Sequence, residues 1–457
     1  MTRTTPKILS GFMELLPWQQ VAFNRIKDII KDTYESFGYS PLDTPVLELS
    51  EVLLAKAGGE TEKQIYRFNK GDTDISMRFD LTVPLARFVS MHQGELVFPF
   101  KRYQIGKVYR GERAQKGRYR EFYQCDIDVI GNETLDISYD AETLAIIYKL
   151  FNRLGLSRFK IKLNNRRILK GFFASLALDD KITEVLRIID KLDKIGLDNV
   201  KAELQKLGVA EEAIEKILLF VSQKGNSEEQ LSFLHGLGIK DESFVSGVEE
   251  LEKVLELTDF YGVPAENIAV SLSIARGLDY YTGTVYETEL TDIPEAGSVC
   301  SGGRYEDLTG FYSDKKMPGV GISIGLTRLF SQLSAKGLVK PCPCVNAVVA
   351  VLPVSDSEKT AVLSFAEKLR GKGINCLTFT EDKKFKAKMN YANRIGVPFA
   401  AIIGENEAKT DSVVIKDMQS GEQKTLNLIE SVEFLSAENA KILTAKPLLE
   451  NIASQEE

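Results

Sequence analysis

Two predicted strands joined by a basic loop, within residues 100–131, constrain the fold of this chain more than any other stretch. Successive side chains of a strand point to opposite faces of its sheet. One face of this hairpin is apolar, and the other carries polar and charged side chains: Arg102, Gln104, Arg110, Gln124, Asp126 and Asp128. Buried polar groups need partners, so the polar face is predicted to be the floor of a site for a charged ligand. An exposed amphipathic hairpin with a solvated turn is the alternative interpretation.

The loop of this hairpin indicates the chemical nature of the ligand. Basic residues occur at positions 101, 102, 107, 110, 113, 116, 118 and 120, and Glu112 is the single acid from Phe100 to Arg120. A segment of this charge attracts phosphate, and the planar guanidinium of arginine binds phosphate through two parallel hydrogen bonds. The hairpin therefore favours a ligand that carries phosphate groups.

Length and charge restrict the class of protein. The chain has 457 residues, enough for several domains. No apolar run approaches the length of a membrane span, and the N-terminus lacks the apolar centre of a signal peptide, so we expect a cytoplasmic protein without a membrane partner. The net charge of −7 argues against nucleic-acid binding through a generally basic surface. Local basic patches would have to hold any nucleic acid.

Histidine and cysteine are too sparse for several kinds of active site. The histidines are His92 and His235, and among the five cysteines only Cys342 and Cys344 are close in sequence, with a spacing that does not suit zinc. We therefore expect no metal site and no histidine-based triad. Arginine, carboxylate, tyrosine and backbone amide groups remain to carry any chemistry.

Changes in the hydrophobic pattern divide the chain into parts. Residues 13–36 have helical periodicity, and the prolines at positions 41 and 45 restrict the next segment to the edge of a sheet, or mark an ordinary connection. Residues 166–258 are helical, whereas strands and helices alternate after residue 346. We expect an α+β fold with a strand-rich domain at 1–165 and 261–336, a helical insertion at 166–260, an α/β domain at 344–435 and a tail at 436–457.

Three segments outside the hairpin carry candidate binding residues. Asp80 follows a predicted strand and suits an ammonium group, although it equally suits the cap of the following helix. Arg276 and Tyr280 flank a glycine turn that suits a small polar or aromatic ligand, with a tyrosine-rich hairpin as the alternative. Gly302 and Gly303 either let the backbone approach a ligand closely or mark a tight turn.

Two further segments indicate binding of anions. Arg328 lies at the N-terminal end of a predicted helix, where backbone amides favour phosphate. The glycines before it mark either the site or close packing of a strand against the helix. The basic segment 383–394, which contains Tyr391, either faces RNA or forms a solvated helix face.

Five of these segments together resemble the histidyl-tRNA synthetases, a family of class II aminoacyl-tRNA synthetases. The three class II motifs are similar to FGYSPLDTPVLE at 37–48, VYRGERAQKGRYREFYQ at 108–124 and GVGISIGLTRL at 319–329. Two stretches specific to the histidyl family are similar to ARGLDYYTGTVYE at 275–287 and SVCSGGRYEDL at 298–308. The resemblance covers nearly the whole chain.

The resemblance implies a fold and an activity. The fold is a class II antiparallel-sheet catalytic domain with a helical insertion, followed by a C-terminal α/β anticodon-binding domain. The activity is ATP-dependent attachment of histidine to tRNA(His) through a histidyl-adenylate. ATP enters as a substrate that carries Mg²⁺, and the chain is expected to form a homodimer.

The resemblance also implies residue roles. Arg110 and Arg276 are the expected catalytic residues, and Arg110, Glu112 and Arg328 the expected ATP ligands. The expected histidine site comprises Asp80, Leu81, Thr82, Gln124, Asp128, Arg276, Tyr280, Tyr281, Gly302, Gly303 and Tyr305. The chain departs from the family pattern at Thr327, where motif 3 usually carries an acidic residue before its arginine.

Three alternatives to a histidine–tRNA ligase remain open on the sequence. The first is a noncatalytic synthetase-like regulatory subunit, such as that of ATP phosphoribosyltransferase. The second is a tRNA-sensing module. The third is a class II synthetase for another amino acid, against which the ARGLDYY stretch argues.

Overall fold

The computed structural model describes residues 3–55, 60–113, 117–274, 281–307, 309–340 and 342–444. The chain divides into two compact units. The larger unit is built mainly from Lys27–Leu338 and the smaller unit mainly from Val339–Glu450.

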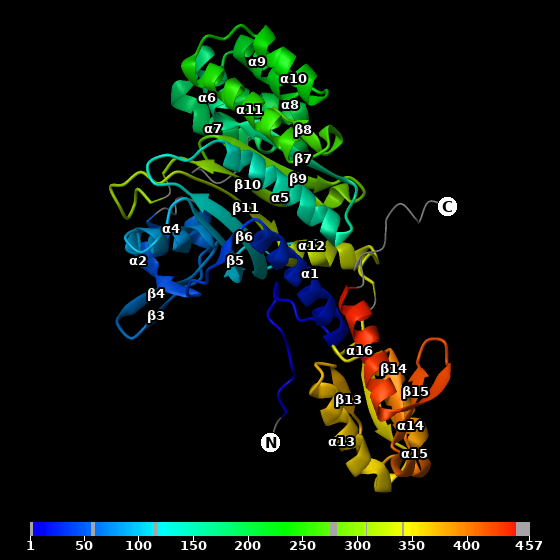
Figure 1. Cartoon of the computed structure of the whole chain (residues 1–457). Helices are drawn as coiled ribbons and strands as arrows, with labels where there is room; N and C mark the ends of the chain where they lie inside the picture. The colour runs from blue at the N-terminus through cyan, green and yellow to red at the C-terminus, as the bar shows by residue number, and fades with distance from the viewer. Residues whose placement is uncertain are drawn as a thin grey trace. The chain divides into compact units, whose positions relative to one another are not determined.

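An eight-stranded sheet forms the centre of the larger unit (Figure 1). In spatial order its strands are β1 (Ser40–Pro41), β5 (Phe100–Tyr109), β6 (Glu121–Ile130), β11 (Gly319–Gly325), β10 (Ser298–Tyr305), β9 (Thr284–Leu290), β7 (Phe159–Asn165) and β8 (Ile268–Val270). The inner pairs are antiparallel, whereas β1–β5 and β7–β8 are parallel. The antiparallel sheet is confirmed. The proline-containing strand β1 lies at the edge, as predicted, where a missing backbone donor is tolerated.

The hairpin of β5 and β6 has the alternation that the sequence predicts. Its apolar face is buried, with Cys125, Ile127 and Val129 fully inaccessible to solvent. Helix α1 (Pro17–Ser36) contacts this strand through the hydroxyl of Tyr34, which donates to the carbonyl oxygen of Cys125 at 3.0 Å. The opposite face therefore has to accommodate the charged side chains.

A small antiparallel sheet leads into the site from the N-terminal side. It consists of β2 (Leu47–Leu49), β4 (Thr73–Met77) and β3 (Arg67–Lys70), with the short helices α2 (Ser50–Leu54) and α3 (Glu60–Gln64) beside them in sequence. After β4 the chain passes through Asp80 into helix α4 (Thr82–Met91). The other helices near the large sheet are α5 (Ser138–Leu154) and α12 (Leu326–Ala335).

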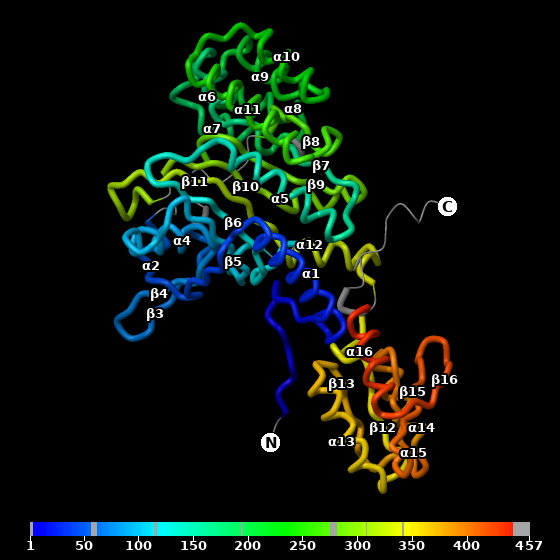
Figure 2. Tube along the Cα trace, in the orientation of Figure 1, coloured from blue at the N-terminus to red at the C-terminus, as the bar shows by residue number. Residues whose placement is uncertain are grey.

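The insertion between β7 and β8 is helical, as predicted. It contains α6 (Arg166–Ser175), α7 (Ile182–Ile189), α8 (Leu192–Lys206), α9 (Glu211–Val221), α10 (Ser227–Gly236) and α11 (Glu242–Phe260). The trace in Figure 2 shows these helices gathered at the end of the sheet formed by β7 and β8. Helices α6 and α11 pack closely, because a Cβ at Gly247 would lie 2.7 Å from the backbone nitrogen of Ile168.

The smaller unit has a five-stranded sheet of mixed direction. Its order is β13 (Cys376–Thr378), β12 (Val349–Pro353), β14 (Phe399–Ile403), β15 (Ser412–Asp417) and β16 (Gln423–Asn427), and its helices are α13 (Lys359–Arg370), α14 (Phe385–Ile395), α15 (Glu405–Thr410) and α16 (Leu428–Thr444). The first three strands are parallel, and the last two add an antiparallel hairpin. Helix α16 crosses the predicted boundary at residue 435, because Leu435 is buried in the core of this unit. The other domain boundaries stay predictions.

In the described part of the chain, no helix is both long enough and apolar enough to cross a membrane. All five cysteines are free thiols, and Cys125 and Cys300 are buried in the large sheet.

Candidate active site

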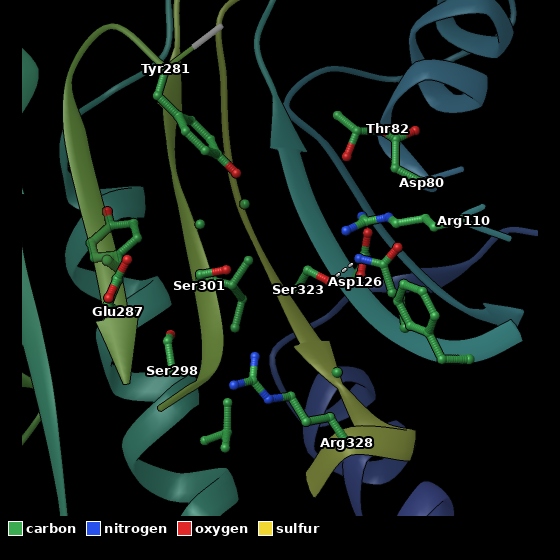
Figure 3. Close-up of a pocket in the computed structure, with 18 of the residues that line it drawn as sticks. Asp80, Thr82, Arg110, Asp126, Tyr281, Glu287, Ser298, Ser301, Ser323 and Arg328 are labelled. Carbon is green, nitrogen blue, oxygen red and sulfur yellow. Dashed lines mark hydrogen bonds between the residues drawn. The ribbon is translucent and has the colours of Figure 1, made fainter. Parts of the chain in front are cut away.

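A cavity of about 430 Å³ opens on the polar face of the large sheet (Figure 3). Four strands of that sheet contribute to its walls: β6, β9, β10 and β11. Its lining residues are Asp80, Thr82, Arg110, Glu112, Gly117, Arg118, Tyr119, Phe122, Gln124, Asp126, Asp128, Tyr281, Tyr286, Glu287, Ser298, Val299, Ser301, Gly302, Tyr305, Gly321, Ile322, Ser323, Gly325 and Arg328. The hairpin is therefore not a solvated surface feature, and its polar face is the floor of a site.

Most of the predicted site residues meet at this cavity. Those that line it are Asp80, Thr82, Arg110, Glu112, Gln124, Asp128, Tyr281, Gly302, Tyr305 and Arg328. Leu81 and Gly303 lie behind the lining. Arg276 and Tyr280 are outside the described residues.

Leu81 and Gly303 contribute to the walls indirectly. Leu81 is fully buried, and its carbonyl oxygen accepts a hydrogen bond from Nη2 of Arg102 at 3.5 Å. A Cβ at Gly303 would lie 2.7 Å from the carbonyl oxygen of Thr284 and 2.9 Å from the ring of Tyr281. Glycine at this position therefore lets the Tyr281 ring lie against the strand.

Gly302 lies in the middle of β10, so the interpretation as a tight turn is wrong. A Cβ at this position would overlap the carbonyl oxygen of Gly321 on the neighbouring strand β11. The glycine is needed for the close approach of two strands that both line the cavity.

Asp80 combines its two predicted roles. Its Oδ1 accepts a hydrogen bond from the backbone N–H of Val83 at 3.0 Å, in the first turn of α4. Its Oδ2 is buried and has no hydrogen-bond partner among the described residues. Burial raises the pKa of Asp80, while the backbone N–H of Val83 and the charge of Arg110 oppose that rise. One oxygen thus holds the helix, and the other is available to a ligand.

The deepest charged group of the site is the pair of Asp128 with Arg102. Their Oδ2 and Nη2 atoms lie 2.6 Å apart, and the Arg102 side chain is fully buried. The other carboxylate oxygen, Oδ1, accepts from the hydroxyl of Tyr305 at 3.0 Å. Burial raises the pKa of Asp128 to about 6, although Arg102 and the Tyr305 hydroxyl both stabilise the ionised form.

Two arginines reach the cavity from different elements, as Figure 3 shows. Nε of Arg110 donates to the carbonyl oxygen of Phe79 at 3.0 Å, and its guanidinium lies over the ring of Phe122. Nη2 of Arg328 donates to the carbonyl oxygen of Ala296 at 2.5 Å. Both side chains are thus held in place by backbone, with the rest of each planar guanidinium suited to phosphate oxygens.

The loop between β5 and β6 contacts helix α12. The hydroxyl of Tyr119 and Oγ of Ser331 lie 2.8 Å apart, and an ion pair of 3.1 Å joins Arg118 to Glu112. Since Glu112, Arg118 and Tyr119 all line the cavity, these contacts hold one of its walls.

Sequence reasoning missed several lining residues. Asp126 was on the predicted polar face, and the alternation that selected Gln124 and Asp128 selects it equally. Glu287, Ser298, Ser301 and Ser323 lie on β9, β10 and β11, and their place in the site follows only from the order of the strands.

Gln104 belongs to the polar face but does not line the cavity. It is buried, and its Nε2 donates to Oδ1 of Asp43 at 2.9 Å near the sheet edge. The polar face therefore extends beyond the site.

The arrangement separates two kinds of charge within one cavity. Carboxylates from Asp80, Asp126 and Asp128 line one part of the cavity, and the guanidinium groups of Arg110 and Arg328 line another. A site of this kind accommodates an amino compound together with a nucleotide.

Comparisons with known proteins match most of the chain to one family. The family model described as histidyl-tRNA synthetase matches residues 11–329, and that described as anticodon binding domain matches residues 348–438. The histidine–tRNA ligase of Clostridium tetani is 52% identical over 431 residues, which cover 94% of this chain and 98% of the relative. That of Finegoldia magna is 46% identical over 430 residues, which cover 94% and 99%.

A solved structure is similar over the same length. The histidyl-tRNA synthetase of Nostoc sp. PCC 7120 has a TM-score of 0.88 and 40% sequence identity, and the match covers 95% of this chain and 100% of that one. One family model thus spans both halves of the large sheet, the insertion and the cavity. The chain belongs to the histidyl-tRNA synthetase family.

Proposed function

We propose that this chain attaches histidine to tRNA(His) in two steps, with histidyl-adenylate formed in the cavity of the larger unit. It acts as a class II histidine–tRNA ligase and uses ATP. The observation that carries the proposal is the division of charge in the cavity, with carboxylates for an amino acid and arginines for phosphate.

Histidine occupies the part of the cavity that contains the carboxylates. Asp80, Thr82 and Gln124 receive its ammonium group. The buried Oδ2 of Asp80, which has no partner in the described part of the chain, supports that role. Tyr281 and, by resemblance, Tyr280 line the imidazole pocket. Asp128 completes the amino-acid site, and the segment from Gly302 to Tyr305 forms its wall.

ATP occupies the part of the cavity that contains the arginines. Arg110 binds the α-phosphate, Glu112 meets the adenine and Arg328 holds the γ-phosphate. Arg276, which the family resemblance assigns, stabilises the histidine carboxylate and the α-phosphate in the transition state. The anchoring of Arg110 and Arg328 by backbone carbonyls supports these roles, because fixed donors need no reorganisation during reaction.

Adenylate formation needs no general base. A carboxylate oxygen of histidine attacks the α-phosphorus in line, a new P–O bond forms, and the bond to the bridging oxygen breaks as pyrophosphate leaves. The arginines stabilise the negative charge that develops on the phosphoryl oxygens. A hydroxyl at the 3′ end of tRNA then takes the histidyl group and releases AMP.

Mg²⁺ is expected to arrive on the phosphates of ATP. The described residues contain no group of three or more side chains that would hold a metal ion. The carboxylate of Glu287 lines the cavity, and it is the acidic group that we propose lies near a nucleotide-bound cation. The ion would neutralise charge on the phosphates.

The partners and location beyond the active site are part of the same proposal. The smaller unit reads the anticodon of tRNA(His). Two copies of the chain form a homodimer, for which the edge position of β1 offers support. The protein works in the cytoplasm.

The test is ATP–pyrophosphate exchange with each amino acid supplied separately. We expect exchange with histidine alone, and a loss of about 100- to 1000-fold in the Arg276→Ala variant, as for other removed transition-state donors. Aminoacylation of tRNA(His) should follow the same amino-acid dependence.

The same assay decides between this function and the remaining alternatives. A regulatory subunit or a tRNA-sensing module would be folded and give no exchange with any amino acid. Exchange with threonine, proline or glycine in place of histidine would assign the chain to a different substrate.

A further inference from the structure

Three side chains that line the cavity each carry a buried oxygen acceptor without a hydrogen-bond partner among the described residues. They are Asp80 through Oδ2, Gln124 through Oε1 and Asp126 through Oδ1. A buried acceptor without a donor costs free energy. Three such acceptors on one cavity indicate a ligand group with several N–H donors, and an ammonium group has three.

Asp126 is the member of this set that has no assigned role. It lies on the cavity floor between Gln124 and Asp128, on the same face of β6. On the neighbouring strand it is opposite Ser323, whose Oγ accepts from Nε2 of Gln124 at 2.5 Å. Figure 3 shows Asp126 and Ser323 facing the space between Arg110 and Tyr281.

Asp126 has a binding capacity that Asp128 lacks. Both oxygens of Asp128 are engaged, one by Arg102 at 2.6 Å and the other by the Tyr305 hydroxyl at 3.0 Å. Among the residues that the structure describes, Oδ1 of Asp126 has no such partner. A new donor that enters the cavity would therefore gain more from Asp126 than from Asp128.

The charges around Asp126 favour a cation. Asp128 on the same strand and Asp80 before α4 both raise its pKa, whereas Arg102 on β5 and the Ser323 hydroxyl on β11 lower it. Three carboxylates thus surround this part of the cavity, with Arg102 beside Asp128 and Arg110 acting on Asp80. Burial is the largest influence, and the pKa of Asp126 reaches about 7. A cation placed beside Asp126 would therefore favour its ionised form.

We propose that Asp126 is a further substrate-binding residue, whose carboxylate joins Asp80 and Gln124 in binding the ammonium group of histidine. This inference rests on the proposed function, because it concerns the same substrate site. When Asp126 is protonated, binding of the ammonium group releases its proton to solvent and leaves a carboxylate–ammonium pair.

The experiment compares two histidine analogues that each lack one charged group. L-Histidinol keeps the ammonium group and the imidazole but has no carboxylate. 3-(Imidazol-4-yl)propionate keeps the imidazole and the carboxylate but has no ammonium group. Binding of both is measured by titration calorimetry at pH 8, with the full-length wild type and with Asp126→Asn, which preserves the shape of the side chain.

Loss of a charge-assisted hydrogen bond to the ammonium group should affect only one analogue. We expect Asp126→Asn to weaken histidinol binding by about tenfold to a hundredfold. Binding of imidazolylpropionate should be unchanged or tighter, because its carboxylate is no longer repelled. Equal weakening for both analogues, or none for either, would overturn the proposal.

Thermal unfolding of the ligand-free proteins gives a second readout. The folded-state pKa of about 7 lies above the ordinary value of 3.8, so ionisation of Asp126 destabilises the fold as pH rises through this range. Asp126→Asn removes that ionisation, and its Tm should exceed the wild-type Tm at pH 8 by more than at pH 5. A purely structural Asp126 would give a lower Tm for the variant at both pH values, which contradicts the proposal.

Failure of the inference and failure of the proposed function are distinguishable. If wild type binds neither analogue and shows no histidine-dependent exchange, the proposed function fails. If wild type binds both and exchanges normally while Asp126→Asn behaves identically, only the role of Asp126 is excluded.

Discussion

The backbone N–H of Tyr123 donates a hydrogen bond to the side-chain oxygen of Thr327 at 2.8 Å. The register of β6 with β11 ends at the pair of Gln124 and Gly325, so Tyr123 lies one residue beyond the part of β6 that is paired with β11. Thr327, which is buried in the first turn of α12, takes over that role and fixes the turn that carries Arg328. The threonine that departs from the usual motif thus has a structural function.

Replacement of Thr327 by valine should destabilise the protein and weaken ATP binding. Valine preserves the shape but leaves the N–H of Tyr123 without an acceptor, at a cost of about 1–3 kcal/mol in the free energy of unfolding. We expect a lower Tm and a higher KM for ATP, with a smaller effect on KM for histidine. Thr327→Ser keeps the hydroxyl, so its Tm and its KM for ATP should both lie close to the wild-type values. A serine variant as impaired as the valine variant would contradict this role.

Substitution of Arg328 should affect ATP more than histidine. The planar guanidinium of Arg328 can bind the Ala296 carbonyl oxygen and a phosphate at the same time. Lysine keeps the positive charge but lacks this planar group of donors. In pyrophosphate exchange we expect KM for ATP to rise about tenfold in Arg328→Lys and about a hundredfold in Arg328→Ala. KM for histidine should change by less than about threefold, and equal changes for the two substrates would exclude a role specific to ATP.

The buried pair of Arg102 and Asp128 should show strong coupling in a double-mutant cycle. Arg102→Met leaves the Asp128 carboxylate without its cation, which costs about 3–5 kcal/mol of stability and raises the pKa of Asp128 further. Asp128→Asn in the same background should recover much of that loss. Denaturant unfolding of the two single variants and the double variant measures the coupling, and additive effects would show that the pair does not act as a unit.

The basic face of α14 should be tested for contact with tRNA. Lys383 precedes this helix and Lys386 lies in it, and both are exposed. Charge reversal of both to glutamate should raise KM for tRNA in aminoacylation and leave pyrophosphate exchange unchanged, because exchange needs no tRNA.

Lys409 on α15 offers a matched control for that variant. It is exposed in the same unit and pairs with Glu405 at 2.6 Å. Lys409→Glu should leave KM for tRNA unaffected. If the α14 variant also leaves it unaffected, the alternative of a solvated helix face is correct.

Many residues of the site could be predicted from the sequence, because their positions depend on the alternation of side chains along single strands. Period-two alternation placed Gln124 and Asp128 on one polar face, and the predicted helix start placed Arg328 in the first turn of a helix. The antiparallel sheet and the helical insertion followed from local patterns and from the resemblance.

Other features depend on contacts between distant segments. Nothing in the local pattern around Gly302 shows that Gly321 lies against it, so a turn was an equally good interpretation. The burial of Arg102 beside Asp128 likewise requires the register of β5 with β6. The sequence places Asp126 on the correct face, but the lack of a partner for its Oδ1 among the described residues depends on contacts between several strands.

The pairing of β6 with β11 has a consequence for synthesis on the ribosome. The two strands are joined through residues such as Gln124 and Ser323, which lie 199 positions apart. The whole helical insertion is translated before β11 emerges, and until then β6 presents an unpaired hydrogen-bonding edge beside a row of unshielded carboxylates. Open strand edges are prone to wrong pairing. The nascent chain therefore has to avoid aggregation while nearly two hundred further residues are synthesised, because only then can β11 pair with β6 and complete the cavity.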